Sequence, residues 1–206
     1  MQVKKLWLVG VLLLAALIFA LYPKQMVKMA ESVADEPLFD VLLNEYAPAK
    51  WNHGYGHYDL TIVSEEGFAC RLGGKWVECR AVMLSYGPIE GDESPARVHF
   101  YTDIRRDHAP ERQLMVYQGL SLKDFDAFMR WLTGSFAKYD SSEWDFHLLR
   151  VKEKDFDRYS VSRKKNCASG ALRLIEELPG IDDPERNGNA GGMEKLTEYF
   201  EKKNYI

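Results

Sequence analysis

The alternation of apolar and polar residues predicts a first part of the chain that is rich in strands. Strand-forming residues alternate in several short runs, and the pair Gly73-Gly74 separates two of these runs as the turn of a hairpin does. The connections between the runs are short, which favours antiparallel pairing. The expected strands cover residues 58–63, 68–72, 75–82, 97–102, 113–117 and 146–151.

Helical spacing of apolar residues predicts helices before and after these strands. Leu38, Val41 and Leu42 indicate a juxtamembrane helix within residues 24–50. A helix begins at Ser121, which forms a capping pair with Asp124. Another runs from Cys167 to Leu178 and ends at Pro179-Gly180, and a short charged helix covers 194–203. Strands followed by helices imply an α+β layer architecture.

The N-terminus contains a membrane-entry segment. Residues 6–22 are uncharged and follow Lys4 and Lys5, as in an anchor whose lysines stay in the cytoplasm and whose following domain is exported. The segment is just long enough to cross a bilayer. A cleaved signal peptide is the alternative, with Ile18-Phe19-Ala20 as a poor cleavage site. Either reading places the body of the protein in an oxidising compartment.

Charge limits the partners of this body. Residues 1–30 hold four of the 27 basic residues and no acid, so 23 basic residues face 31 acids in the remainder. An acidic body without a basic stripe argues against a nucleic-acid partner and against adhesion to anionic lipid through charge.

The chain has three cysteines, and an odd number in an exported protein leaves one unpaired. Cys70 and Cys79 lie on the two arms of the predicted hairpin, and a disulfide there would contribute roughly 2.5–3 kcal/mol. Two reduced, partly buried thiols are the alternative. Cys167 then remains at the start of a helix, where unpaired N–H groups favour a thiolate. Its alternative role is that of a small buried residue.

A histidine precedes the first strand of the domain. His57 follows Gly56, a small residue that would let a substrate approach the ring. Thiol hydrolysis needs a nucleophile at a helix start, an imidazole base and a polar group that orients the imidazole. Cys167 and His57 therefore form the candidate catalytic pair.

The segment Gly56-His57-Tyr58-Asp59-Leu60-Thr61-Ile62, followed far downstream by Tyr159 and by Asn166-Cys167-Ala168, resembles the circularly permuted papain-like hydrolases. This branch of the NlpC-type peptidases includes the lecithin:retinol acyltransferase group. The resemblance implies Cys167 as nucleophile, His57 as general base and His99 at the third, polar position, with His53 and His108 as substitutes for His99. It also implies that Asn166, Gly56 and Tyr159 line the substrate site.

The prediction is therefore an α+β protein with an N-terminal transmembrane helix and a permuted papain-like domain, in which an antiparallel sheet packs against helices. Its parts are an anchor or signal segment (1–30), a lead-in (31–50), the domain (51–182) and a loop with a C-terminal helix (183–206). No cofactor is expected. Nor is a metal, because Gly54 and Gly56 disfavour the helix that would align His53 with His57.

The expected function is a thiol hydrolase or acyltransferase at the bacterial inner membrane, with its domain in the periplasm. It would cleave amide, ester or thioester bonds of an envelope peptide or acyl group. The alternative is a non-catalytic, membrane-anchored binding or assembly protein of the envelope, and an exported toxin or its immunity partner is a third reading.

Overall fold

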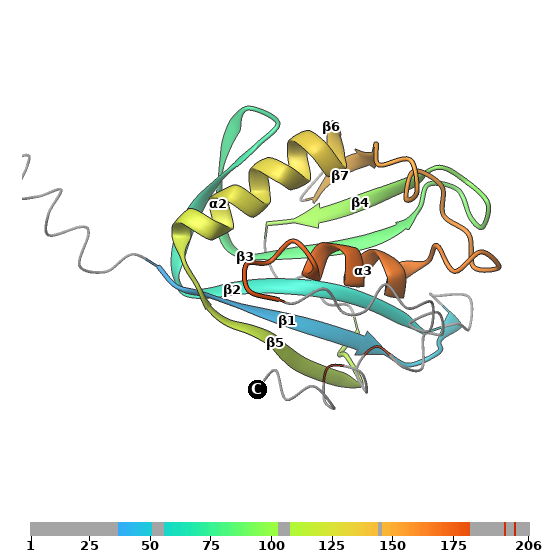
Figure 1. Cartoon of the computed structure of the whole chain (residues 1–206), viewed down its shortest axis with the longest axis horizontal. Coiled ribbons are helices and arrows are strands. Elements are labelled where there is room, and N and C mark those ends of the chain that lie inside the picture. The colour runs from blue at the N-terminus through green and yellow to red at the C-terminus, as the bar shows by residue number, and fades with distance from the viewer. Residues whose placement is uncertain are drawn as a thin grey trace, which may run out of the picture. The chain divides into compact units, whose positions relative to one another are not determined.

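A computed structural model describes residues 37–50, 56–102, 108–143 and 146–181, together with Leu196 and Phe200. These residues belong to one compact unit, which begins at Pro37. Figure 1 shows its strands as a broad twisted sheet. The strands are β1 (Phe39–Tyr46), β2 (His57–Leu72), β3 (Lys75–Pro88), β4 (Ala96–Tyr101), β5 (Arg112–Leu120), β6 (Ala137–Glu143) and β7 (Phe146–Val151).

The seven strands form a single sheet in the order β5-β1-β2-β3-β4-β7-β6. Every neighbouring pair is antiparallel, and β1 to β4 form a meander of consecutive strands. Because β5 and β6 lie at opposite edges, the connection between them has to cross the sheet. The helix α2 (Leu122–Trp131) and the π-helical turn η2 (Leu132–Phe136) make this connection.

The predicted hairpin is confirmed. Leu72 pairs with Lys75 across the turn, and Gly73 and Gly74 have φ angles of +55° and +83°. Two consecutive residues in the left-handed region define the tight turn whose twist matches that of the flanking strands. Only glycine adopts this conformation at no steric cost, which explains the Gly-Gly pair.

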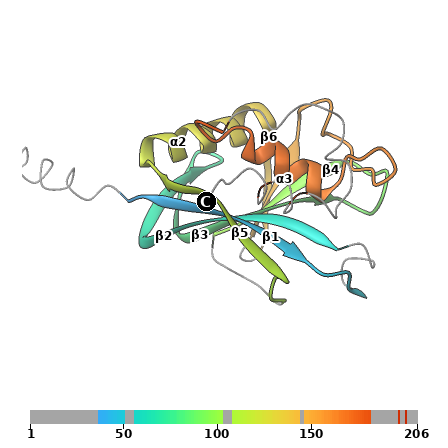
Figure 2. The same cartoon turned by 60° about the horizontal axis from the view of Figure 1, so that its bottom comes forward.

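Both helices lie on one face of the sheet (Figure 2). The predicted cap of α2 is confirmed, since the side chain of Ser121 accepts a hydrogen bond from the backbone N–H of Asp124. Phe125 of α2 stacks on Phe39 of β1, with ring centroids 4.4 Å apart. The second helix, α3 (Cys167–Ile175), has six buried residues, Cys167, Ala168, Gly170, Ala171, Leu174 and Ile175. Burial of these apolar faces against the sheet is the main source of stability.

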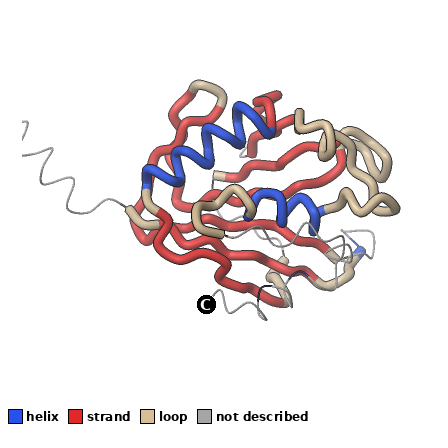
Figure 3. The backbone as a smooth tube through the Cα atoms, viewed as in Figure 1, coloured by secondary structure: helices blue, strands red, loops and turns tan. Residues whose placement is uncertain are grey.

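The predicted fold class is wrong. In the described residues, seven antiparallel strands carry the structure and only two α-helices cover it, as the preponderance of strand in Figure 3 shows. The described part of the chain is therefore a mainly antiparallel β structure rather than the α+β domain that was expected. The lead-in helix is wrong where the structure describes it, because Phe39–Tyr46 is the strand β1.

The predicted membrane segment at residues 6–22 lies outside the described residues. Within the part of the chain that the structure describes, no helix combines the length and the apolar character that crossing a bilayer requires. The charged helix predicted over 194–203 is also mostly outside this part, although Leu196 and Phe200 are helical and buried in the core.

Candidate functional site

The start of α3 fixes the position of Cys167. Asn166 is the N-cap, and its side-chain oxygen accepts hydrogen bonds from the backbone N–H groups of Ala168 (3.1 Å) and Ser169 (3.3 Å). In return, the hydroxyl of Ser169 accepts from the backbone N–H of Asn166 at 2.9 Å. This reciprocal capping box satisfies donors that a helix start otherwise leaves unpaired. Asn166 therefore stabilises the first turn of α3, which includes Cys167.

Strands β2 and β3 separate next to this helix start. Their last paired residues are Leu60 and Leu84. Beyond that pair, the first residues of β2 continue to pair with β1, and the last residues of β3 continue to pair with β4. The backbone N–H of Tyr58, in the separated part of β2, donates to the sulfur of Cys167. Cys167 therefore lies against the chain segment that carries His57.

The environment of the sulfur combines burial with several donors. Burial of Cys167, which is 1% exposed, raises the pKa of its thiol. The backbone N–H groups of Tyr58, Ala168 and Cys167 and the hydroxyl of Tyr159 all act in the opposite direction and lower this pKa. Burial is the largest effect, so the thiol is protonated at neutral pH. The donors are nevertheless arranged as they would be for a developing negative charge.

Tyr159 lies directly at the thiol. Burial raises the pKa of its hydroxyl, and the nearby charge of Cys167 raises it further. The phenol is therefore a neutral donor at physiological pH. Tyr159 was predicted to line the substrate site, and the structure places its hydroxyl at the sulfur of Cys167.

His57 makes its described side-chain contact across the gap to β3. Its Nε2 lies 2.7 Å from the hydroxyl oxygen of Ser85. Burial, with a smaller contribution from the charge of His99, lowers the pKa of His57 to about 4. The imidazole is therefore neutral at physiological pH, the form that can accept a proton.

His99 stands one strand further along. It is directly opposite Ser85 in the register of β3 and β4. Burial lowers the pKa of His99 to about 4, with a smaller contribution from Arg97. His57, Ser85 and His99 therefore lie on the consecutive strands β2, β3 and β4. His99 was predicted to orient the ring of His57, but the described contact of this ring is with Ser85.

The other predicted site residues have separate positions. Gly56 has a φ of +64°, and a Cβ there would lie 3.0 Å from the backbone oxygen of Tyr46. The backbone conformation alone therefore explains the glycine at position 56. The predicted role of Gly56 in giving a substrate access to His57 is not needed to explain it. His108 is exposed shortly before β5. His53 lies outside the described residues.

Sequence reasoning missed Ser85. It is the one polar residue in the run Ala81-Val82-Met83-Leu84-Ser85-Tyr86, and this interruption is the only signal of it that the sequence contains.

Sequence reasoning also missed a buried polar cluster beside His57. Asn44 donates to Asp59 at 2.6 Å and to Thr61 at 2.9 Å, and Gln113 donates to Asn44 at 2.7 Å.

This polar cluster fixes the start of β2. Asp59 and Thr61 follow His57 at every second position, so all three side chains point to the same face of the sheet. Asn44, Asp59 and Thr61 are each less than 5% exposed. Hydrogen-bonded polar groups that are buried to this extent impose one arrangement on their neighbours, because misalignment would leave them unsatisfied.

The two remaining cysteines lie on the hairpin as predicted. Cys70 and Cys79 are buried free thiols, and their sulfur atoms are 3.1 Å apart, compared with about 2.05 Å in a disulfide. The thiol of Cys70 donates to the sulfur of Cys79, which raises the pKa of Cys70 and lowers that of Cys79. The predicted disulfide stays a prediction.

Metal ligation finds no support in the described ranges, which contain no group of three or more His, Cys, Asp or Glu side chains suited to a metal ion.

Comparison with known proteins finds no related protein: no family profile, no curated protein and no solved structure matches the chain. The resemblance to the NlpC-type hydrolases therefore stays a prediction.

Proposed function

We propose that the protein is a thiol-dependent acyl hydrolase or acyltransferase, with Cys167 as nucleophile and His57 as general base. One observation carries the proposal. The sulfur of Cys167 accepts a hydrogen bond from the N–H of Tyr58, in the gap between β2 and β3, and the preceding residue His57 has its imidazole held by Ser85 across that gap. The contact of Tyr58 with the sulfur brings the chain segment that carries His57 to Cys167, although 110 positions separate the two residues.

The protonation states favour general-base catalysis over a preformed ion pair. A raised thiol pKa and a lowered imidazole pKa mean that both groups are neutral in the resting enzyme. His57 therefore accepts the thiol proton only as the sulfur attacks the carbonyl carbon. With Nε2 bound to Ser85, Nδ1 is the ring nitrogen assigned to this transfer in the proposal.

The rest of the reaction follows from the donors around the sulfur. In the proposal the backbone N–H of Cys167 stabilises the oxyanion of the tetrahedral intermediate, because Asn166 already accepts from the N–H groups of Ala168 and Ser169. His57 then returns the proton to the leaving amine, alcohol or thiol, and an acyl thioester remains on Cys167. Water, activated by His57, releases the acid and restores the thiol. An acceptor other than water would make the protein an acyltransferase.

The proposed substrates are amide, ester or thioester bonds of envelope peptides or acyl groups. This part of the proposal follows from the N-terminal segment at residues 6–22, which predicts an inner-membrane anchor and a periplasmic domain. It is separate from the catalytic assignment, which does not depend on location.

An activated ester such as p-nitrophenyl acetate tests the proposal. We expect mass spectrometry of samples quenched with acid before deacylation to find the acetyl group on the peptide that contains Cys167. The Cys167→Ala variant should not be acylated, and His57→Ala should react about 10²–10⁴-fold more slowly. The matched control is Cys79→Ser, which removes a different buried thiol and should react at the wild-type rate. Acylation of Cys167 at an equal rate in the wild type and in His57→Ala would refute the role of the imidazole.

A second candidate is a binding or assembly protein without turnover. The observation in its favour is the 1% exposure of Cys167, because free cysteine is commonly a small buried residue of the core. On this reading Cys167 remains unmodified in the folded protein and reacts only after denaturation. The same experiment separates the two candidates, since only the hydrolase yields an acyl-enzyme under native conditions.

A further inference from the structure

A row of positive charges crosses three neighbouring strands on the side of the sheet away from β5. Arg97 of β4 is directly opposite Arg150 of β7, and Arg150 is directly opposite Lys138 of β6. Residues that face each other in an antiparallel pair have their Cβ atoms about 4.5–5.5 Å apart on the same face, and like charges in this arrangement are destabilising. The formal net charge of the chain is −4, so a generally basic composition does not account for the row.

The side chain of Arg97 lacks a partner for one of its donors. Its Nε is buried and has no hydrogen-bond acceptor within the described part of the structure. Buried polar atoms are nearly always paired, so this donor is available to an acceptor that enters from outside the chain. Nε is also one of the two donors with which a guanidinium group binds a carboxylate or phosphate side-on.

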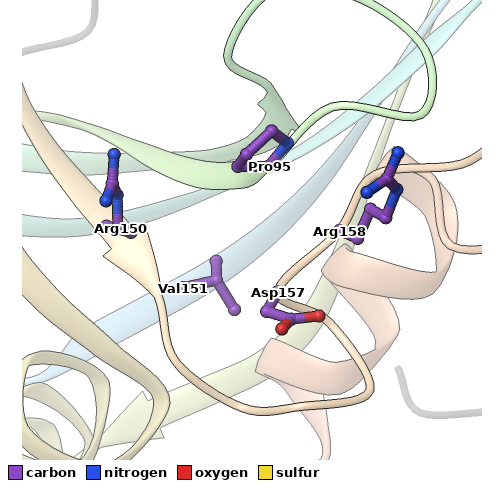
Figure 4. Close-up of a pocket in the computed structure, with 5 residues that line it drawn as sticks. All are labelled: Pro95, Arg150, Val151, Asp157 and Arg158. Carbon is purple, nitrogen blue, oxygen red and sulfur yellow. The ribbon is translucent and has the colours of Figure 1, made fainter.

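A cavity of about 280 Å³ opens beside Arg150. Its lining residues are Pro95, Arg150, Val151, Asp157 and Arg158, and Figure 4 shows Arg150 and Arg158 on opposite sides of Pro95. Arg97 does not line the cavity but neighbours it, because it lies two residues after Pro95 and directly opposite Arg150. The volume is slightly below the range of typical small-molecule pockets. It therefore suits one acidic group rather than a large ligand.

The acids near the cavity do not neutralise its arginines equally. Glu93 pairs with Arg158 at 3.5 Å. Asp157 lines the cavity, and its charge contributes to the raised pKa of Tyr86. Among the described residues, no acid forms an ion pair with Arg97 or Arg150. Counting Arg97, three arginines face the two acids Glu93 and Asp157, so one positive charge at this place remains uncompensated.

We propose that Arg97 and Arg150 form an oxyanion-binding site, which takes a carboxylate or phosphate group in the cavity next to Pro95. The guanidinium of Arg97 donates through Nε, and Arg150 closes the site from β7. Arg158, already paired with Glu93, contributes to the positive rim. Pro95 and Val151 provide an apolar wall for the carbon skeleton attached to the anion. The site does not depend on the chemistry proposed for Cys167.

Thermal unfolding of the full chain in the presence of anions tests the site. Inorganic phosphate and acetate are titrated separately, with sodium chloride at the same ionic strength as reference. We expect at least one of the two to raise Tm by about 2–4 °C at roughly five times its Kd. A response to phosphate alone assigns a phosphate ligand, and a response to acetate alone assigns a carboxylate.

Charge-neutral variants make the test specific. Arg150→Gln and Arg97→Gln should abolish the anion-dependent rise in Tm, whereas Arg130→Gln, which removes an exposed arginine on α2, should keep it. Without anions at low salt, Arg150→Gln should be at least as stable as the wild type, because it removes a like-charge pair. The site is refuted if neither anion exceeds chloride, if Arg150→Gln retains the full rise, or if Arg150→Gln lowers Tm in the absence of anions.

Discussion

The imidazole Nε2 of His57 lies 2.7 Å from the hydroxyl oxygen of Ser85 on the neighbouring strand. The two residues lie beyond the last paired positions of β2 and β3, so the side-chain contact spans a gap that the backbone ladder leaves open. A base that is held through one ring nitrogen has a defined orientation for the other. The contact therefore gives Ser85 a positioning role for His57.

Replacement of Ser85 by alanine should lower kcat/KM for ester hydrolysis by about tenfold and leave the fold intact. The imidazole would lose the partner that fixes its orientation, while Cys167 and its donors would stay in place. Ser85→Thr should restore most of the activity, since threonine keeps the hydroxyl. A merely structural role predicts a loss of stability in Ser85→Ala with no change in the His57 titration, which NMR of the ring protons measures.

The burial of two histidines should make stability dependent on pH. His57 and His99 each have a pKa of about 4 in the folded protein, compared with 6.5 for an unperturbed histidine. Between these values the unfolded chain binds more protons than the folded one, so the free energy of unfolding falls as the pH drops from about 6.5 to about 4. The contribution of His57 is on the order of 2–3 kcal/mol.

Urea unfolding at pH 7, 6 and 5 measures this effect. Carboxylates also titrate at the acid end of the window, so the decisive comparison is between variants. His99→Gln should weaken the pH dependence, whereas His108→Gln, which removes an exposed histidine, should leave it as in the wild type. Identical pH dependence in all three proteins would show that the buried histidines do not cause it.

The sequence predicts the elements whose local signals agree with their tertiary surroundings. The turn at Gly73-Gly74 requires two left-handed residues, and the start of α2 requires a cap such as Ser121, so both were placed correctly. The helical spacing of Leu38, Val41 and Leu42 predicts a helix where the structure has β1. In this strand Val41 and Leu43 are buried on one face and Asn44 is buried on the other. A strand covered on both faces loses the alternation that identifies it.

Two other features depend on information that no local pattern contains. Strand β6 lies at the edge of the sheet, and its polar sequence resembles a loop until β7 pairs with it. The contact of Ser85 with His57 depends on where β2 and β3 separate. The sequence suggests Cys167 and His57 as a candidate pair because a helix start and a strand start are both visible in it, and this pair stays a prediction. Ser85 comes next to His57 only through the strand register.

The hairpin cysteines should form a disulfide when the protein folds under oxidising conditions. Cys70 and Cys79 already face each other with their sulfur atoms 3.1 Å apart, and the lowered pKa of Cys79 makes it the first to ionise. Refolding in a glutathione redox mixture should give a product that gains two hydrogens on reduction. Closing this short loop should stabilise the fold by roughly 2.5–3 kcal/mol.

The double variant Cys70→Ser/Cys79→Ser provides the comparison for the disulfide. Its unfolding should be insensitive to the redox mixture, while the wild type should be more stable when oxidised. Recovery of only reduced protein after oxidative refolding, or equal stability of both forms, would contradict the prediction and would weaken the argument for an exported domain.

Gly170 should not tolerate a side chain, because α3 packs there directly on β3. A Cβ at Gly170 would lie 2.6 Å from the Cβ of Tyr86, far inside van der Waals contact. Tyr86 is 1% exposed, and its hydroxyl donates to the backbone oxygen of Phe156 at 2.7 Å, so the ring has little freedom to move. Gly170→Ala should therefore lower the free energy of unfolding by about 1–3 kcal/mol, as overpacking does.

Gly134 offers a matched control for this substitution. It is exposed, and no atom lies within 4 Å of the position that its Cβ would occupy, so Gly134→Ala should be neutral or slightly stabilising. Combining Gly170→Ala with Tyr86→Leu should recover part of the lost stability, because the smaller side chain makes room for the methyl group. If Gly170→Ala costs no more than Gly134→Ala in urea unfolding, α3 does not lie as close to β3 as the structure places it, and the position of Cys167 against Tyr58 would have to be revised with it.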